Sequence, residues 1–463
     1  MNPGLRNRSE SHRPREESGE PRLIRLHQAI PDVDPWALLS LAGEKQVFAW
    51  HDPQGDKSFV ALGLVREFRA RGESRYLEAA RTVQAWQSRV MDRALDSTFS
   101  HGLPLVVGGF AFDAQGRHDI WSRWGDSWFW VPEILVHRGP EGCHAVICGE
   151  ADGVSLGVLQ QRLSEIVRQL QAQSVSWTSP PAPGNFVGGA PDLLAWETWS
   201  GSVRSALKSL EAGELEKVVL ARSEFYRAGE NACFDPVATA FALRERQEGC
   251  TTFLIQQPGE AFVGSTPEEL VRLTGRHLKT VAIAGTRARL DSAPQDHGLQ
   301  DSDKDQLEQR LVSQAIREAL APVASEVLDP QLPQVASFAD VHHLRELVEA
   351  RLRPGVGVFE LICRLHPTPA VGGRPREAAL QWLLEHEGLD RGWYAGPVGW
   401  VAPNGDSVFS VAIRSALLTK QGALAFAGCG LVPQSEARAE WEEAQVKLQT
   451  VQQGLVTTTE GDV

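Results

Sequence analysis

The sequence predicts an α+β fold built on antiparallel sheets, on the basis of three observations. Strand-like segments follow one another across short turns, as at residues 403–406, and this arrangement is typical of antiparallel hairpins. Amphipathic segments with apolar residues at helical spacing, such as 154–173, separate groups of these strands. The composition, 42% hydrophobic and 23% charged over 463 residues, is that of an ordinary soluble globular protein with a large core.

The periodicity places the individual elements along the chain. We expect strands near 106–112, 217–222, 251–256, 261–264, 278–286, 393–401, 407–415 and 423–430. Helices are expected over 154–173, 199–210, 302–321 and 436–453, with a short helix after Pro267 and a helix-like stretch beginning at His342. An aromatic cluster is expected in the core and consists of Trp121, Trp124, Trp128 and Trp130.

The polar stretches divide the chain into regions. Residues 1–22 are rich in Arg, Glu, Ser and Pro and are expected to be a disordered tail. A loose stretch at 174–191 separates an N-terminal lobe, 23–190, from a second region, 192–453, and residues 454–463 are expected to be flexible. No apolar run has the length of a membrane span, and the N-terminus lacks the apolar segment of a secretory signal, so we expect a cytoplasmic protein.

Charge and cysteine content exclude several classes of function. The chain has 46 basic and 59 acidic residues, a net charge of -13, and no basic block, so a nucleic-acid partner is not expected. Its 6 cysteines lack the paired spacing of a zinc site or a disulfide framework. An anionic substrate would therefore need local cations or a metal.

A lysine stands at the start of the apolar run 217–222. With the two-residue period of a strand, Lys217 shares a face with Val219 and Ala221. A buried ammonium loses hydration, so its neutral form is favoured and it can act as a base near neutral pH. Alternatively, Lys217 marks the entry of the strand and extends to solvent. The strand alone leaves both interpretations open.

Two further stretches place polar or small residues at the ends of strands. Glu268 follows Pro267, so its carboxylate is either an acid of a site or a partner of backbone amides in the first turn of a helix. The strand near 278–286 ends in Gly285 and Thr286, where the backbone can approach a ligand closely or simply turn.

Two expected helices carry carboxylates at the same spacing. Asp305 and Glu308 are three residues apart, as are Glu440 and Glu443, so each pair occupies one helix face. If the helices face each other, the four acids form an oxygen site of the kind that Mg²⁺ accepts, and otherwise they are solvated surface charges. Lys447 follows Glu443 by four residues and would either neutralise it or reach an anionic substrate.

The remaining candidates are a cation, a histidine and two loops. Arg414 interrupts an apolar strand, and its planar guanidinium suits a carboxylate, although an edge-strand arginine in water fits the pattern as well. His343 is either a core histidine with satisfied hydrogen bonds or part of a pocket. Residues 365–373 form a rigid Pro/Gly loop, and the small-residue strand end 425–430 can border a pocket.

Together these stretches resemble the chorismate-utilising enzymes, a family that includes anthranilate synthase component I, aminodeoxychorismate synthase, salicylate synthase and isochorismate synthase. The matching residues are EKVVLAR, GSTPEEL, AIAGTR, KDQLEQ, HHL, HPTPAVGG, RGWYAGPVGW, SVAIRS, AGCGLV and EWEEAQVK. The resemblance implies a single large domain of stacked, mostly antiparallel sheets flanked by helices, with 192–453 as the chorismate-binding catalytic region. Within the family, the chain most resembles the isochorismate synthases.

The resemblance implies a role for each candidate residue. Lys217 would be the base that activates water, and Glu268 the acid that protonates the departing hydroxyl. The Mg²⁺ carboxylates would be Glu308 and Glu443, with Asp305 and Glu440 as partners behind them. The implied substrate-binding residues are Gly285, Thr286, His343, Ala370, Tyr394, Ile413, Arg414, Gly428 and Lys447.

The expected reaction agrees with this set of residues. Chorismate carries two carboxylates, which Mg²⁺, Arg414 and Lys447 would neutralise. Water attacks C2 as the double bond shifts and the C4 hydroxyl leaves, so a base and an acid are needed on opposite sides. Environments that push two titrating groups in opposite directions provide such a pair. The implied enzyme is an isomerase, a hydroxymutase, with Mg²⁺ as cofactor.

Alternatives within the family are a salicylate synthase and an amine-transferring enzyme. Lys217 favours water as the nucleophile, as does Ala370, where those relatives are expected to have threonine. A non-catalytic chorismate-binding subunit is the alternative from another class. The chain departs from the family at Gln309, where histidine is common, and in a short loop at 291–302. We expect a monomer without an obligatory glutaminase partner, acting in menaquinone or, alternatively, siderophore biosynthesis.

Overall fold

Two large sheets and ten helical segments make up the described part of the chain. The computed structural model describes residues 22–54, 57–95, 102–114, 120–172, 184–188, 193–289 and 297–459. The helical segments are η1 (Pro35–Leu41), α1 (Arg75–Arg89), α2 (Leu156–Ala172), α3 (Leu193–Glu211), α4 (Pro236–Arg246), η2 (His297–Leu299), α5 (Asp303–Leu320), α6 (Val358–Leu365), α7 (Arg376–His386) and α8 (Ala437–Gln452).

The larger sheet has 13 strands. They are β1 (Leu23–Ile30), β2 (Val47–Asp52), β3 (Lys57–Leu62), β5 (Val90–Ala94), β8 (Ile134–Gly139), β9 (Gly142–Glu150), β10 (Phe186–Gly188), β11 (Lys217–Ala228), β13 (Thr251–Gln257), β14 (Glu260–Thr266), β20 (Gly373–Arg374), β23 (Ser415–Thr419) and β24 (Gly422–Leu431). Their spatial order is β10-β11-β24-β23-β14-β13-β2-β3-β8-β9-β1-β5, and β20 pairs with β11.

The second sheet has 10 strands. They are β4 (Arg66–Ala70), β6 (Val106–Phe110), β7 (Ser127–Val131), β15 (Glu269–Thr274), β16 (His277–Ala288), β17 (Ala324–Val327), β18 (Gln334–Ser337), β19 (Val341–Leu352), β21 (Pro397–Val401) and β22 (Ser407–Val411). Their order is β17-β19-β16-β15-β22-β21-β6-β7-β4, with β18 beside β19. A small separate pair joins β12 (Ala232–Phe234) to β25 (Thr457–Thr459).

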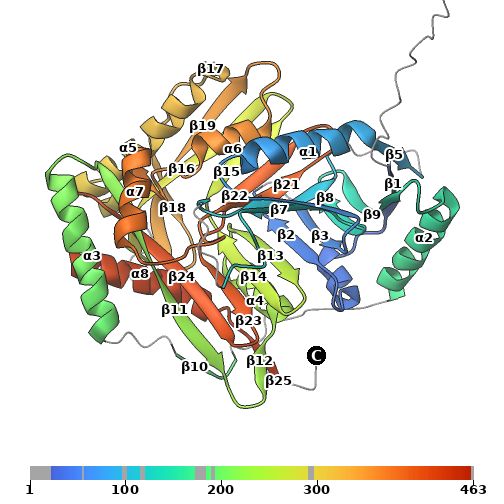
Figure 1. Cartoon of the computed structure of the whole chain (residues 1–463), viewed down its shortest axis with the longest axis horizontal. Coiled ribbons are helices and arrows are strands. Elements are labelled where there is room, and N and C mark those ends of the chain that lie inside the picture. The colour runs from blue at the N-terminus through green and yellow to red at the C-terminus, as the bar shows by residue number, and fades with distance from the viewer. Residues whose placement is uncertain are drawn as a thin grey trace, which may run out of the picture.

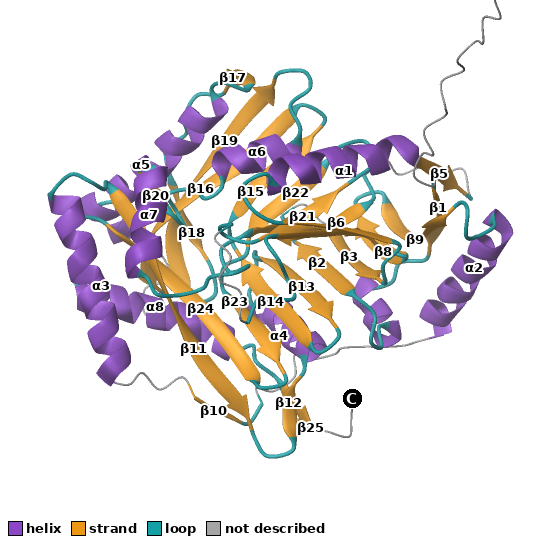
Figure 2. Ribbon diagram, viewed as in Figure 1, coloured by secondary structure: helices purple, strands orange, loops and turns teal. Residues whose placement is uncertain are grey.

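The expected fold class is confirmed. Among the described strand pairs only β1 and β5 run parallel, and helices cover the outside of the sheets (Figures 1 and 2). In Figure 1, α3 and α8 lie outside β11 and β24 at one end of the molecule, and α2 lies at the other. Both sheets take strands from both halves of the chain, since β2 pairs with β13 and β6 with β21.

Aromatic rings fill the space between the two sheets. Phe59 of β3 meets Trp400 of β21 edge-on with ring centroids 6.3 Å apart, and Phe48 of β2 meets Trp130 of β7 at 5.9 Å. Such edge-to-face pairs add about 0.5–1.5 kcal/mol each beyond the area that they bury. The predicted tryptophan cluster belongs to this core, because its four members are fully buried. A second core lies on the other face of the larger sheet, under η1, α2 and α4.

Three local expectations were wrong. The residues after Pro267 form β15 rather than a short helix, and His342 and His343 lie in β19 rather than in a helix. From position 345 onward, β19 alternates between less buried and fully buried residues, the two-residue period of a strand. Arg414 lies after the end of β22, with φ of 50°, and not within a strand.

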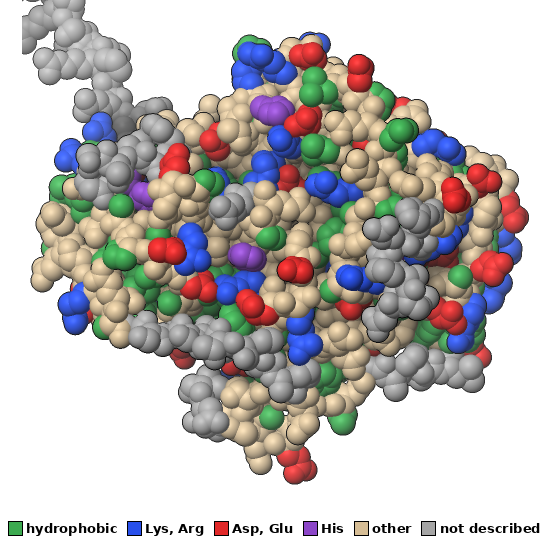
Figure 3. Space-filling view, turned by 180° about the vertical axis from the view of Figure 1, so that it is seen from behind, with side chains coloured by type: hydrophobic (Ala, Val, Ile, Leu, Met, Phe, Trp, Pro, Cys, Tyr) green, Lys and Arg blue, Asp and Glu red, His purple; other side chains and the backbone are tan. Residues whose placement is uncertain are grey.

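The remaining expectations concern the termini and the surface. The expected tail at 1–22 lies outside the described residues except for position 22, and so does most of 174–191. In the expected flexible segment 454–463, Thr457–Thr459 form β25, and 460–463 are not described. Over the described residues, no helix combines the length and apolarity required to cross a bilayer. Lys and Arg side chains are interspersed with Asp and Glu on the face in Figure 3.

Candidate active site

A cavity lies where α5 and α8 approach the two sheets. The predicted site residues that line it are Glu268, Gly285, Thr286, Glu308, His343, Ala370, Tyr394, Ile413, Arg414, Gly428 and Lys447. Four other predicted residues do not line it; they are Lys217 on β11, Asp305 on α5, and Glu440 and Glu443 on α8. The structure therefore brings 11 of the 15 predicted site residues together around one cavity.

The chain crosses from one sheet to the other twice beside this cavity. Glu268 lies on the crossing between β14 and β15, and Arg414 on the crossing between β22 and β23. The two crossings are hydrogen-bonded to each other, since Val411 N donates to the Glu268 carbonyl at 3.0 Å and Ser265 N donates to the Arg414 carbonyl at 3.2 Å. This arrangement fixes the acid and the arginine relative to both sheets.

Lys217 is completely buried, so the interpretation in which it extends to solvent was wrong. Its Nζ lies 2.9 Å from Oε1 of Glu308. Burial raises the pKa of Glu308, but the adjacent Lys217 ammonium outweighs burial and holds that pKa below its usual value. The other oxygen, Oε2, accepts a hydrogen bond from Gly285 N at 3.2 Å. Glu308 is thus an ionised carboxylate between a cation and a backbone amide.

Glu268 has the opposite environment. Burial raises its pKa to about 7, against the lowering effects of Lys217, a hydrogen bond from Thr368, and Lys447. The Thr368 hydroxyl lies 3.4 Å from Oε1. Because this pKa lies near neutrality, the carboxylic acid can hold a proton at neutral pH and release it within the cavity. The pKa values of the two glutamates near Lys217 are therefore shifted in opposite directions.

His343 orients Arg414 in the cavity wall. The guanidinium Nη2 lies 2.7 Å from His343 Nε2, and His343 Nδ1 lies 2.9 Å from the Gly285 carbonyl. A guanidinium only donates and a carbonyl only accepts, so the ring is neutral, with its proton on Nδ1. Burial, Arg414 and Lys447 lower the pKa of His343 well below its usual value, in agreement with this tautomer.

The carboxylate pairs on α5 and α8 form the acidic end of the site. Lys447 Nζ binds Oε1 of Glu443 at 2.7 Å and the Gly428 carbonyl at 3.0 Å. Lys304 binds Oε1 of Glu440, whereas Oε2 of Glu440 is buried without a hydrogen-bond partner. Burial and the adjacent Glu443 raise the pKa of Glu440. This end of the site therefore has unsatisfied capacity for a cation.

The donor set suits magnesium rather than a metal held by many protein ligands. Among the described residues, no three His, Cys, Asp or Glu side chains converge as a ready-made metal cluster. Magnesium needs only one or two carboxylates, because it keeps several of its water molecules. Asp305 adds a further acid, whose pKa is raised by burial and by Glu308 although a hydrogen bond with Ser302 lowers it. The acids on α5 and α8 thus fit a hydrated dication.

The chain matches the family model described as "Chorismate binding enzyme" over residues 8–456. It belongs to the chorismate-binding enzyme family. A 35% identical relative is the salicylate biosynthesis isochorismate synthase of Pseudomonas aeruginosa, with 94% of this chain and 90% of that protein covered. The isochorismate synthase MenF of Bacillus subtilis is 29% identical, with 92% of each covered.

Solved structures show the same family fold. The menaquinone-specific isochorismate synthase MenF of Escherichia coli aligns with a TM-score of 0.74 and 26% identity, covering 94% of this chain and 96% of that one. Anthranilate synthase component I of Streptococcus pneumoniae aligns with a TM-score of 0.71 at 20% identity, covering 87% and 93%. The two stacked sheets with outer helices are therefore the architecture of the chorismate-binding enzymes.

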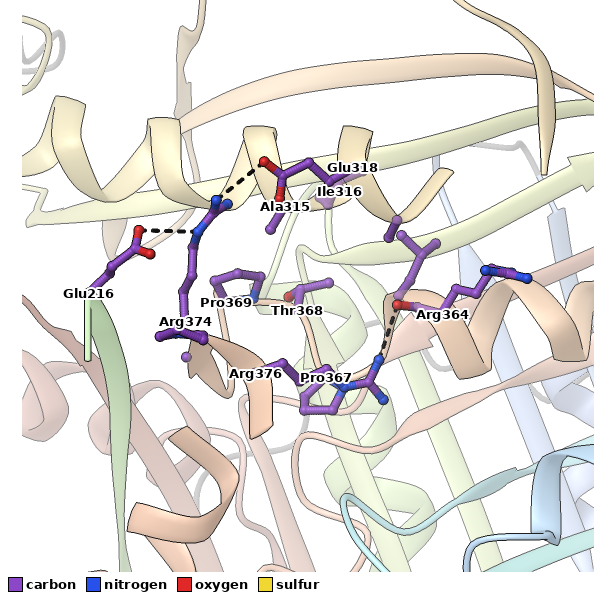
Figure 4. Close-up of a pocket in the computed structure, with 14 residues that line it drawn as sticks. Glu216, Ala315, Ile316, Glu318, Arg364, Pro367, Thr368, Pro369, Arg374 and Arg376 are labelled. Atoms are coloured by element: carbon purple, nitrogen blue, oxygen red, sulfur yellow. Dashed lines mark hydrogen bonds and ion pairs between the residues drawn. The ribbon is translucent and has the colours of Figure 1, made fainter. Parts of the chain in front are cut away.

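A larger hollow is lined in part by Pro367, Thr368 and Pro369, in the loop that precedes β20 (Figure 4). Three arginines line it, but each is already engaged. Arg374 binds Glu216 at 3.2 Å and Glu318 at 3.3 Å, and Arg376 donates to backbone carbonyls. The smaller cavity is the candidate active site, because Glu268, whose pKa is raised, and the cations Arg414 and Lys447 line it.

Sequence reasoning missed several residues that shape the site of this chorismate-binding enzyme. Thr368 was within a quoted motif, but nothing in the sequence connects it to Glu268. Lys304 immediately precedes Asp305, so the sequence could have indicated that it neutralises one of the acids of the site. Gln309, at the position where histidine is common, donates to the Ala282 carbonyl at 3.1 Å and ties α5 to β16.

Gly430 belongs to the strand end 425–430, which was expected to border a pocket and does so, but the sequence did not indicate its particular role. A Cβ at this position would lie 2.2 Å from Glu308 Oε1 and 2.8 Å from Lys217 Cε. Gly430 therefore leaves room for the buried pair of Lys217 and Glu308. Glycine within a strand often marks such a close approach, but the sequence does not say what approaches.

Replacing Gly430 by alanine is expected to displace both members of this pair. A shift of about 1 Å in a reacting group can reduce turnover by about 100-fold, and we expect a loss of at least about that size. Gly157→Ala is the control, because a Cβ at position 157 meets nothing within 4 Å. Steady-state rates of both variants, measured at a temperature well below their melting temperatures, show the effect. Unchanged turnover in Gly430→Ala would show that the close approach is not needed.

Proposed function

We propose that this protein is an isochorismate synthase, which converts chorismate to isochorismate. The observation that carries the proposal is the buried acid Glu268, with a pKa of about 7, in a cavity whose wall also holds Arg414 and Lys447. Relatives named isochorismate synthase span nearly the whole chain. One of these relatives is named for salicylate biosynthesis, and another, whose structure is solved, is named as menaquinone-specific. The proposal is limited to the conversion of chorismate to isochorismate, which both names share.

The cations of the cavity suit a substrate with two carboxylates. Arg414 presents a planar guanidinium that His343 holds in place, and this geometry matches one carboxylate. We assign the second carboxylate to the end of the cavity near Lys447 and Gly428. Tyr394 and Phe426 stack with ring centroids 5.1 Å apart and form an apolar wall against the ring of the substrate.

Lys217 and Glu268 then supply the two proton transfers. Glu268 protonates the leaving C4 hydroxyl, and Lys217 takes a proton from the water that attacks C2. Lys217 is paired with Glu308, so it becomes a base only when this carboxylate is engaged by another cation. Water as the nucleophile removes the need for a glutaminase partner, which supplies ammonia in amine transfer.

We assign Mg²⁺ to Glu308 and Glu443. The fit rests on the two acidic pairs of α5 and α8 and on the buried, unpartnered Oε2 of Glu440. When bound, the metal would neutralise the substrate carboxylate and draw charge from the reacting ring. Lys304 and Lys447, which already bind Glu440 and Glu443, hold these acids in place.

The product of the purified protein tests this function. Incubation with chorismate and Mg²⁺, followed by chromatography, is expected to yield isochorismate as the main product, and a chelator is expected to stop the reaction. A parallel incubation with an ammonium salt is the matched control. Formation of anthranilate or aminodeoxychorismate in the presence of ammonium would assign the chain to the amine-transferring enzymes. Formation of salicylate and pyruvate in either incubation would assign it to the salicylate synthases.

A further inference from the structure

We propose that Glu387 and Arg391 form a positioning pair that fixes the strand of Lys217 against the loop of Thr368 and Ala370. The inference rests on the proposed function and adds two residues to it. Neither residue lines the cavity, so neither is expected to touch the substrate. Their effect on the reaction comes from the two segments that they join.

The Arg391 guanidinium binds backbone carbonyls on both segments. Its Nη2 donates to the Val219 carbonyl of β11 at 2.6 Å, two residues after Lys217. Its Nη1 donates to the Val371 carbonyl at 2.7 Å, in the loop between α6 and β20. Val219 and Val371 both line the cavity. One rigid, planar group therefore sets the separation between two parts of the cavity wall.

Glu387 completes the connection from the other side. Its two oxygens each lie 2.6 Å from Arg391, at Nε and Nη2. Its Oε2 also accepts a hydrogen bond from Ala221 N at 2.8 Å, so the carboxylate binds β11 two residues after Val219. The strand is thus held at a carbonyl by the arginine and at an amide by the glutamate.

The burial of this pair suggests a role in geometry rather than in stability alone. Both side chains are only 3% exposed. Burial lowers the pKa of Arg391, but Glu387 more than compensates and raises it, so the guanidinium stays charged. Desolvating two charges costs several kcal/mol per ion, and an apolar pair of similar volume is often as stable. An apolar pair, however, could not hold two backbone carbonyls in a fixed geometry.

Loss of the pair would move catalytic groups more than substrate-binding cations. The loop that Arg391 holds also carries Thr368, which binds Glu268, and β11 carries Lys217. Arg414 and Lys447 lie on other elements, the β22–β23 crossing and α8. We therefore expect a fall in kcat with little change in KM.

Arg391→Lys tests the inference, with Arg25→Lys as a matched control. Arg25 is also buried, and it also binds one carboxylate, Asp92 at 2.6 Å, and two carbonyls, Leu103 at 3.2 Å and Pro104 at 3.1 Å. It lies on β1, outside the cavity lining. Both variants are expected to lower the melting temperature. Only Arg391→Lys is expected to reduce kcat, by about 10- to 100-fold, with KM for chorismate changed less than about threefold.

Hydrogen exchange gives a second measurement that does not depend on activity. Arg391→Lys is expected to increase exchange in peptides covering 217–222 and 366–373, and Arg25→Lys is not. Equal kcat losses in the two variants, or an unchanged kcat and unchanged exchange in Arg391→Lys, would overturn the inference. A wild-type protein that makes no isochorismate would instead overturn the proposed function, and the exchange experiment would still decide whether the pair holds the two segments.

Discussion

Replacing Glu268 by glutamine is expected to reduce kcat by about 10²- to 10⁴-fold, the usual contribution of a general acid. Glutamine keeps the shape and a hydrogen-bonding group for Thr368, but it cannot transfer a proton. Chorismate affinity is expected to change little, since Arg414 and Lys447 remain. Steady-state kinetics for kcat and calorimetry for chorismate binding separate the two effects.

The pH dependence sharpens this prediction. The acid must be protonated, so wild-type kcat is expected to fall as pH rises through about 7, the pKa of buried Glu268. In Glu268→Gln this dependence is expected to disappear from the residual rate. Because the folded-state pKa is raised from 4.5, ionisation also costs the folded protein stability as pH rises from about 4.5 through 7. The variant is expected to avoid that loss.

Glu269→Gln is the matched control. Glu269 is the next residue, is largely buried, and has a pKa that burial raises although Arg272 opposes the rise. It binds Arg272 and does not line the cavity. Its kcat and pH profile are expected to stay close to wild type. A full rate in Glu268→Gln, or an equal loss in Glu269→Gln, would show that Glu268 is not the acid.

Lys217→Ala is expected to abolish measurable turnover for a related reason. The variant loses the base and also leaves the buried carboxylate of Glu308 without its nearest cation. Breaking a buried ion pair from one side typically costs about 3–5 kcal/mol of stability. The thermal melting temperature is therefore expected to fall, and kinetics must be measured well below it.

Two additional experiments separate the base from the structural charge. Lys217→Arg keeps a cation beside Glu308 but provides a group that does not lose its proton, so it is expected to be inactive although folded. Small primary amines added to Lys217→Ala are expected to restore part of the rate, and to do nothing for Glu268→Gln. Activity in Lys217→Arg close to wild type would exclude Lys217 as the base.

Part of this site could be predicted from the sequence because its residues carry chemistry at regular spacing. The pairs on α5 and α8 stand three residues apart, and a cation in an apolar strand is conspicuous at Lys217. The stacked antiparallel sheets followed from a resemblance spread over many short motifs. For the acidic pairs and for Lys217, the information lies within a few residues of the feature that it predicts.

The rest depended on contacts between distant segments. Arg391 meets Val219 only through the fold, and Gly430 matters because Glu308 of another element occupies the space above it. The error at Pro267 has a similar origin. The residue pattern Pro-Glu-Glu fits the first turn of a helix, but pairing of β15 with β22 decided the conformation. Strand pairing therefore outweighed the local preference of these residues for a helix.

The pairing of β6 with β21 has a consequence for how the protein is made. Val106 and Val401 are paired across neighbouring strands of one sheet, so the ribosome must translate most of the chain before that sheet can close. Until then β6 has an open edge that other chains can join. Such non-local pairing folds slowly and leaves strands exposed while synthesis continues. We therefore expect expression at low temperature, or with additional chaperones, to give more folded protein for these experiments.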